Sequence, residues 1–453
     1  MIVALRRQRG NTCRCGFPAA LRFPALNLYS SGIRAAGGGA TRNEKGVGVG
    51  MHKWFGLMFL LFLAAGFVLL PTYPLLLASR GGTGPDLAPW DVLIPSSAMA
   101  IGTASAPFVV RRARRRRLSD TAQLSRFLGR AAAAVLAASL CFEFWQPHAM
   151  PDGLARIVVL GCVLGIWSLS FACSLAYLYA CVLSQLSQRR ERLLFYRSGG
   201  SLGYVVAGLC LGMVVPISPI ALLLAALGLT GLSIYTSQLS AIEAAPRAES
   251  DPAAATVSTL VRRFGWDIVL LAIALPLAAR GYEIFACPFL LASGVHWPTA
   301  IMVAGVVVEA CLLAGLPRFF SAHNYYRVFV LSAGWIVAYA GLAALSASGS
   351  RWTLSAVVAC VGLNAVVNTA LAVAIDYRIS ACDREVAQAI LAALNGIGAV
   401  TGTIVSNLTT KVFDQFHWLN TWTGLWIVSL LIATIPVAIW LVSTLQRWRT
   451  THP

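Results

Sequence analysis

Two charged residues stand three positions apart inside a long apolar run of this sequence. Arg280 and Glu283 lie in the stretch "ARGYEIFACPF", residues 279–289. Residues three apart on a helix share a face, so these two side chains can form an ion pair that turns toward a polar interior. Such a pair either joins helices as a buried salt bridge or lines a cavity. We favour the cavity, because ionisable groups inside a membrane usually mark substrate or ion pathways.

A second carboxylate lies deep in another apolar run. Glu309 is near the middle of the predicted helix 299–316, and Arg280 is near the middle of 267–292, so both fall close to a membrane midplane. One guanidinium neutralises only one of the two carboxylates, and the other can then bind and release a proton. We expect Glu309 to carry the proton and Glu283 to pair with Arg280, although exchanged or shared roles remain open.

The composition requires a bilayer around these residues. Of the 453 residues, 58% are hydrophobic and 11% are charged, and the mean hydropathy is +0.73. Windows of about 20 apolar residues predict an all-α membrane protein with twelve spanning helices. The predicted spans are 54–78, 91–110, 128–146, 156–183, 199–214, 218–237, 267–292, 299–316, 327–347, 353–376, 387–410 and 422–445.

The basic residues indicate the orientation of these spans. The chain has 35 Lys and Arg against 17 Asp and Glu, and they concentrate in loops such as 111–130, 189–197 and 247–263. Loops on the other side are poor in them. This bias places both chain ends in the cytoplasm, most simply at a cytoplasmic (inner) membrane, and accounts for the basic charge without a nucleic-acid partner.

The order of segments predicts two similar halves. Six helices over 51–237 are followed by a cytoplasmic linker at 238–266, six more helices over 267–446 and a cytoplasmic tail at 447–453. Residues 1–50 are Arg- and Gly-rich, and we expect a disordered basic tail, or a segment upstream of the true start at Met51. Six helices, a linker and six helices are the plan of the major facilitator fold.

Several strings resemble one family of that superfamily. "RSGGSLGY", residues 197–204, matches the pattern R-x-x-G-[ST]-[IL]-G-[FY]; "LMFLLFLAAGFVLLPTY", "SAPF", "GVVVEACLLAGLPRFF" and "AILAALNGIGAVTG" are similar to other segments of it. Together they resemble the nucleoside:proton symporters, which are related to lactose-permease-like carriers. The Arg-rich loop 111–117 departs from the superfamily's usual Gly and Asp pattern. The resemblance therefore does not imply the superfamily's usual gating role for that loop.

The resemblance implies a set of site residues. It places substrate contacts at Arg197, Ser201 and Tyr204, and it carries the family's buried glutamate to Glu309. In the seventh helix, two amide ligands of the family fall on Arg280 and Glu283, which puts its usual substrate in question. Asn364 and Asn368, one turn apart, lie near substrate-facing positions of the tenth helix.

These observations predict a secondary transporter that moves a nucleoside or similar small polar solute by proton symport. Alternatives on the same fold are a proton-coupled sugar carrier and a drug exporter; a transport-impaired membrane sensor is a further one. The expected partners are the solute, protons and the lipid bilayer, and we expect a monomer. We expect no catalytic group, metal or other cofactor, because the histidines lie in predicted loops and no HExxH or acid–histidine cluster occurs.

Overall fold

The computed structural model describes residues 53–69, 89–114, 118–144, 153–186, 189–214, 219–242, 256–293, 298–319, 325–348, 363–416 and 420–451. Within these ranges every regular element is a helix, as expected where backbone polar groups must be satisfied inside each segment. The predicted tail 1–50 and residues 115–117 of the Arg-rich loop lie outside the described residues.

The helices of the first half follow the predicted order. A helix at Lys53–Leu69 comes first. It is followed by α2 (Pro89–Arg114), α3 (Asp120–Phe144), α4 (Gly153–Leu186), the short 3-10 helix η1 (Arg190–Arg192), α5 (Leu193–Val214) and α6 (Pro219–Ile242). The division between α5 and α6 confirms that the predicted spans 199–214 and 218–237 are separate helices.

The second half begins after α7 (Val257–Phe264), an amphipathic helix inside the predicted linker that we did not expect. The remaining elements are α8 (Trp266–Ala292), α9 (Pro298–Gly315), η2 (Leu316–Arg318), η3 (Tyr325–Ser332), α10 (Ala333–Ser348), α12 (Asn364–Arg378), η4 (Ala381–Asp383), α13 (Arg384–Phe416) and α14 (Thr421–Thr451). The predicted span 327–347 therefore starts as a 3-10 helix, and the first part of the predicted span 353–376 lies outside the described residues.

The all-helical membrane fold is confirmed. Eight helices in the described ranges are long and apolar enough to cross a bilayer, and Lys53–Leu69 is a shorter apolar helix. Several helices extend beyond their predicted ends: α3 begins at Asp120 rather than 128, and α5 at Leu193 rather than 199. The first turn of α3 is polar and begins at Asp120, and Arg197 follows the first turn of α5, so a hydropathy window misses both segments.

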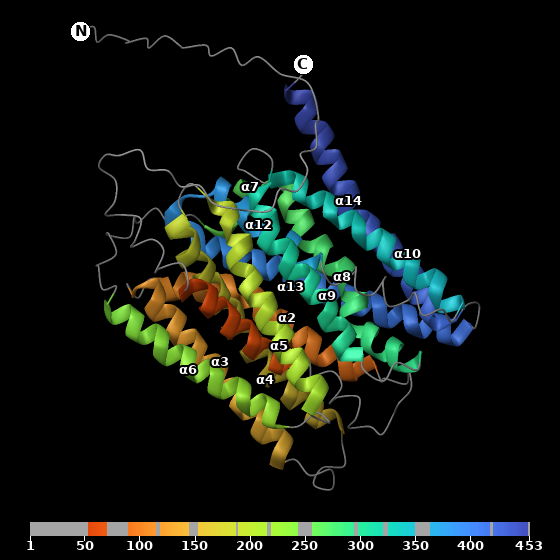
Figure 1. Ribbon diagram of the computed structural model, residues 1–453, viewed down its shortest axis with the longest axis horizontal. Coiled ribbons are helices and arrows are strands. Elements are labelled where there is room, and N and C mark those ends of the chain that lie inside the picture. Colours follow the sequence, from red (N-terminus) through yellow and green to blue (C-terminus); the bar gives the residue numbers. More distant parts are fainter. Residues whose placement is uncertain are drawn as a thin grey trace, which may run out of the picture. The chain divides into compact units, whose positions relative to one another are not determined.

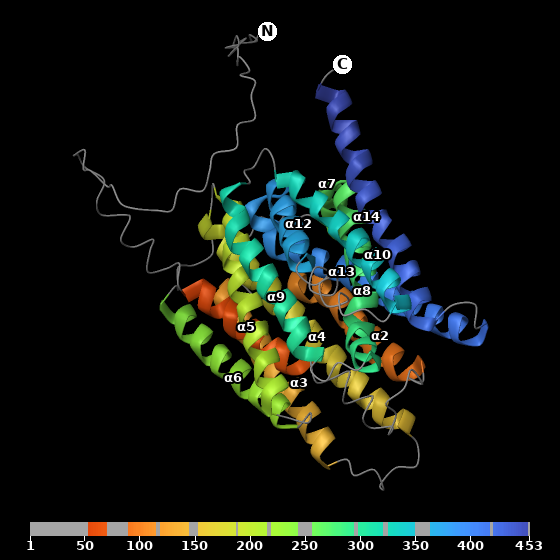
Figure 2. The same cartoon turned by 45° about the vertical axis from the view of Figure 1, so that its right-hand side comes forward.

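The described helices belong to one compact unit, Gly48–Pro453. In the first half, α3 packs against α4 and α6, and α2 packs against α4; in the second, α14 packs against α8 and α10. Figure 1 and Figure 2 both show α6 beside α3 and α10 beside α14. Contacts between the halves are made by α13 with α2 and by α5 with α9.

Glycines on α13 allow close contacts with α8. A Cβ at Gly398 would overlap the main-chain oxygen of Ile273 on α8, and one at Gly402 would lie 2.7 Å from the Cβ of Arg280. Small residues let two backbones approach in a membrane, where close packing replaces the hydrophobic drive. The seam between α8 and α13 is therefore set by glycine, and it fixes the backbone beneath Arg280.

Candidate functional site

A cavity of about 440 Å³ lies between the two halves. Side chains from the helix Lys53–Leu69 and from α4, α5, α8, α9, α10, α12 and α13 line it. Every site residue predicted from the sequence is at its wall: Arg197, Ser201, Tyr204, Arg280, Glu283, Glu309, Asn364 and Asn368. The structure thus brings together residues from four helices that are far apart in the chain.

The pair on α8 forms the ion pair that its spacing predicts. Arg280 Nη1 lies 2.9 Å from Glu283 Oε2, and the Arg280 side chain is 14% exposed while that of Glu283 is 38% exposed. Arg280 Nε also donates to Thr403 Oγ1 on α13 at 3.0 Å. The guanidinium is therefore also anchored to α13, and the carboxylate is the more exposed member of the pair.

Two asparagines on α12 extend this pair into a directed chain of hydrogen bonds. Asn364 Nδ2 donates to Glu283 Oε1 at 2.8 Å, and Asn368 Nδ2 donates to Asn364 Oδ1 at 2.7 Å. The one-turn spacing predicted from the sequence is what lets the second amide reach the first. The α8 pair and the α12 amides therefore form one continuous polar wall.

Glu309 on α9 is not unpaired, contrary to our expectation. The Ser201 hydroxyl donates to its Oε1, and Arg197 Nη1 donates to Ser201 Oγ at 3.1 Å. The sequence argument counted one guanidinium at this depth because it began the fifth helix at 199. Since α5 begins at Leu193, Arg197 lies on the helix one turn before Ser201 and supplies a second guanidinium.

The charges of the cavity wall balance. The described residues that line it include two arginines, Arg197 and Arg280, and two glutamates, Glu283 and Glu309. With both carboxylates ionised they sum to zero, and one bound proton makes the site positive. Glu309 is 6% exposed, so its charge is taken up by the Ser201–Arg197 side of the cavity rather than by water.

Aromatic side chains form another part of the wall, which the sequence did not predict in full. Phe62 and Phe171 meet edge to face at 5.7 Å, and the Arg197 guanidinium lies 3.8 Å from the centre of the Phe62 ring. Tyr204 and Tyr282 also line the cavity. Phe285, one turn beyond Tyr282 on α8, lies outside the lining and belongs to a buried cluster of α8, α10 and α14.

Ion pairs join the two halves at the end of α12 that is away from Asn364. We call this set the latch: Arg114, Arg190, Glu191, Asp376, Tyr377, Asp383 and Arg384. Arg114 Nη1 lies 3.0 Å from Asp383 Oδ1, and Arg190 Nε lies 3.1 Å from Asp376 Oδ2. Arg384 also pairs with Asp376, and the Tyr377 hydroxyl donates to Glu191 Oε2 at 3.0 Å. This end of the cavity is therefore closed by contacts between the halves.

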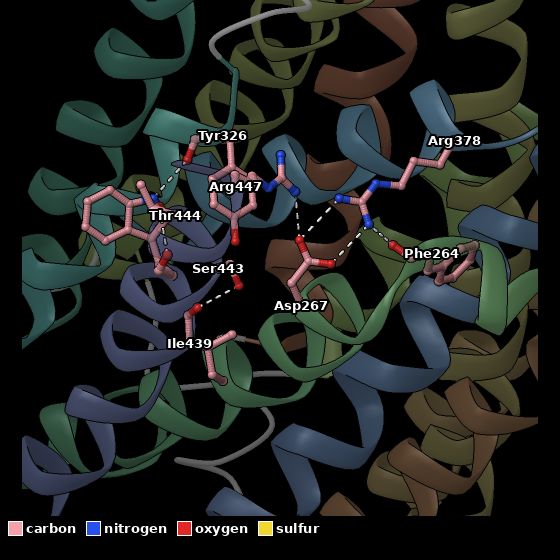
Figure 3. A network of polar contacts seen from close by, with 9 residues as sticks. Phe264, Asp267, Tyr326, Arg378, Ile439, Ser443, Thr444 and Arg447 are labelled. Atoms are coloured by element: carbon pink, nitrogen blue, oxygen red, sulfur yellow. Dashed lines mark hydrogen bonds and ion pairs between the residues drawn. The ribbon is translucent and has the colours of Figure 1, made fainter. Parts of the chain in front are cut away.

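Asp267 is the centre of a second polar network, within the C-terminal half (Figure 3). Its carboxylate accepts from Arg378 at 3.1 and 3.2 Å and from Arg447 Nη2 at 2.8 Å. Arg378 also donates to the main-chain oxygen of Phe264, the last residue of α7. The network therefore ties the end of α12, which carries latch residues, to the start of α8, the end of α14 and the linker helix.

Among the described residues, no group of three or more His, Cys, Asp or Glu side chains is arranged to hold a metal ion.

The residues that sequence reasoning missed are Phe62, Phe171, Tyr179 and Gln388 at the cavity. Their types are common in membrane helices, and only the helix packing brings them to the wall. The signal available for Gln388 was a lone amide in an apolar run.

Comparison with known proteins gives a consistent result. The model of the family described as nucleoside H+ symporter matches residues 87–447. No curated protein sequence matches the chain. Among solved structures, a mutant of the nucleoside transporter NupG is similar, with a TM-score of 0.62, 16% identity, and 86% of this chain and 98% of that chain covered.

Two further solved structures show the same fold. A bacterial homologue of the iron transporter ferroportin, in an outward-facing state, has a TM-score of 0.62 at 13% identity, with 86% of this chain and 98% of that chain covered. FucP, a major facilitator superfamily transporter in the outward conformation, has a TM-score of 0.55 at 14% identity, with 87% and 99% covered. At these identities the likeness establishes the fold.

Proposed function

The chain belongs to the nucleoside H+ symporter family, and we propose that it carries a nucleoside or a closely similar neutral solute across the membrane together with a proton. The family is one of transporters, so the cavity is a transport site rather than an enzyme's active site. The observation that carries the proposal is the cavity between the halves, in which two carboxylates and two guanidiniums of balanced charge face uncharged amides.

The cavity suits a neutral cargo with one flat apolar face and several hydrogen-bonding groups. Its aromatic wall, with Phe62 and Phe171, offers surfaces for a base or a sugar ring. The C-terminal half offers Glu283, Asn364 and Asn368 at the same cavity, whose amide and carboxylate groups suit hydroxyl and amino groups. A volume of about 440 Å³ is in the range of small-molecule sites.

Proton coupling is assigned to Glu309, with Glu283 as the alternative carrier. Glu309 is buried and reached by a hydroxyl and, through it, by Arg197. A proton on Glu309 would leave Arg197 without an anionic neighbour through Ser201, so protonation changes the charge that the cargo meets. This link between the proton and the cargo is what symport requires, since each must alter the free energy of the other's binding.

The latch supports an alternating-access cycle. The conformation described here is closed at the latch end, and transport requires these ion pairs to break when the halves rock. Basic residues at the latch, read with the positive-inside rule, support the proposal that this end and both chain ends are on the cytoplasmic side. We propose a monomer of two six-helix halves, 51–237 and 267–446, joined by the linker 238–266, in an inner membrane.

Uptake into proteoliposomes tests this function. Radiolabelled uridine and adenosine are offered with the outside more acidic than the lumen, and matched vesicles with equal pH serve as the control. We expect saturable uptake that exceeds the external concentration only with the pH gradient. Absence of saturable uptake of either nucleoside would reject the proposed cargo, whereas uptake that ignores the gradient would reject proton coupling.

A further inference from the structure

Three amide oxygens at the cavity wall lack a hydrogen-bond donor within the part of the chain that the structure describes. Among the described residues, no hydrogen-bond partner is found for Asn368 Oδ1, Gln388 Oε1 or Asn395 Oδ1, and each atom is buried. All three residues line the cavity, on α12 and α13. A buried acceptor without a donor is costly to leave unsatisfied, so these oxygens at the cavity call for a hydrogen-bond donor from a bound molecule.

The orientation of the Asn368 amide follows from the charge at Glu283. The ionised Glu283 carboxylate only accepts, so Asn364 turns its Nδ2 toward it at 2.8 Å and leaves Oδ1 on the other side. Asn368 must then turn its own Nδ2 toward Asn364 Oδ1, at 2.7 Å. The chain of bonds therefore ends in Asn368 Oδ1, an acceptor with no donor among the described residues.

The orientation of the Gln388 amide is fixed by a different contact, which does not involve Glu283. Its Nε2 donates to the main-chain oxygen of Ala372 at 3.0 Å, an atom that only accepts, so the amide cannot be reversed without losing this bond. The side chain is 3% exposed. Ala372 lies one turn before Asp376 of the latch, which puts Gln388 at the closed end of the cavity.

We propose that Asn368 and Gln388 form an acceptor subsite on the latch side of the cavity that binds hydroxyl or amino hydrogens of the cargo. The subsite presents acceptors only, so it favours groups that donate hydrogen bonds and disfavours anions. This inference rests on the proposed function and adds to it that a hydroxyl or amino group of the solute points toward the latch. It makes Gln388 a specificity-determining residue.

Binding of matched nucleosides tests the subsite. Adenosine, 2′-deoxyadenosine, 3′-deoxyadenosine and purine riboside, which lacks the 6-amino group, are compared by displacement of labelled adenosine from the purified protein. We expect the wild type to bind one of the three analogues about five- to tenfold more weakly than adenosine, because one hydrogen bond is lost. The analogue affected tells whether a sugar hydroxyl or the base amino group enters the subsite.

The variant Gln388→Met should reduce that preference to within about twofold while the ratios for the other analogues stay unchanged. Ratios within one variant do not depend on how much protein folds. Gln388→Leu removes the same acceptor with a differently shaped apolar side chain and should give the same loss of preference, which covers the case in which the Met variant does not fold.

Gln123 is the matched control. It is 2% exposed, and its Nε2 donates to the main-chain oxygen of Ala113 at 2.9 Å, but it lies outside the cavity lining. Gln123→Met should leave all ratios as in the wild type. Equal analogue ratios in Gln388→Met and the wild type, or no preference in the wild type, would overturn the subsite while leaving nucleoside transport standing. If the wild type binds no nucleoside, the proposed function fails together with the subsite.

Discussion

Replacing Glu309 with glutamine separates cargo movement from proton coupling. Glutamine keeps the side-chain length and an oxygen that can accept from the Ser201 hydroxyl, so the local packing of this 6% exposed residue should be retained. It removes the group that binds a proton. We therefore expect Glu309→Gln to exchange nucleoside across the membrane but not to accumulate it.

The size of the effect follows from the number of carboxylates involved. If one buried carboxylate carries one proton per cycle, each unit of pH difference supplies about 1.4 kcal/mol, which corresponds to about tenfold accumulation of a neutral cargo. The wild type should approach that ratio at a gradient of one pH unit, and the variant should stay near one. Loss of the Glu309 charge also leaves the cavity positive. Because the proposed cargo is neutral, we expect its affinity to change by less than tenfold.

The assay compares two readouts in the same proteoliposomes. Counterflow of labelled against unlabelled nucleoside reports movement of the cargo, and gradient-driven accumulation reports coupling. Glu283→Gln is the matched variant, since Glu283 is the other carboxylate of the cavity wall. Accumulation by Glu309→Gln at the wild-type ratio would refute the assignment, and loss of accumulation in Glu283→Gln alone would transfer the proton to Glu283.

Three further substitutions test the framework around the site. Asp376→Asn removes a 1% exposed carboxylate that two arginines share, which should destabilise the latch-closed conformation by about 3–5 kcal/mol and shorten its lifetime in spin-label distance measurements across the latch. Gly265 has φ +82° and ψ 151°, and Gly265→Ala would also place a Cβ 2.7 Å from Arg378 Nη1. We expect this variant to lose about 1–3 kcal/mol in the free energy of unfolding, measured as a lower melting temperature. Gly402→Val would push α13 from α8 at Arg280, and we expect weaker nucleoside binding with the cavity's other side unaffected, measured with the same displacement assay.

Much of the candidate site was legible before the fold because charge is expensive in a membrane. Arg280, Glu283 and Glu309 stand out in apolar runs, and the structure places all three at one cavity. The spacing of three between Arg280 and Glu283 also specifies their ion pair, since helix geometry alone brings them together. Hydropathy similarly predicts the helical class, because the bilayer leaves few other ways to satisfy the backbone.

The pairing of Glu309 could not be found this way. Its partner Ser201 is far away in the chain, and Arg197 lies in a polar helical turn that reads as loop until α5 is seen to begin at Leu193. The latch shows the same limit: Asp376 has the character of an ordinary helix-end acid, and only the packing of the halves brings Arg190 to it. Sequence alone determined which residues are costly to bury and which lie on one helix face. Tertiary structure decided which charges meet and which amide oxygens at Asn368 and Gln388 lack a donor, because those depend on contacts between helices that local periodicity does not encode.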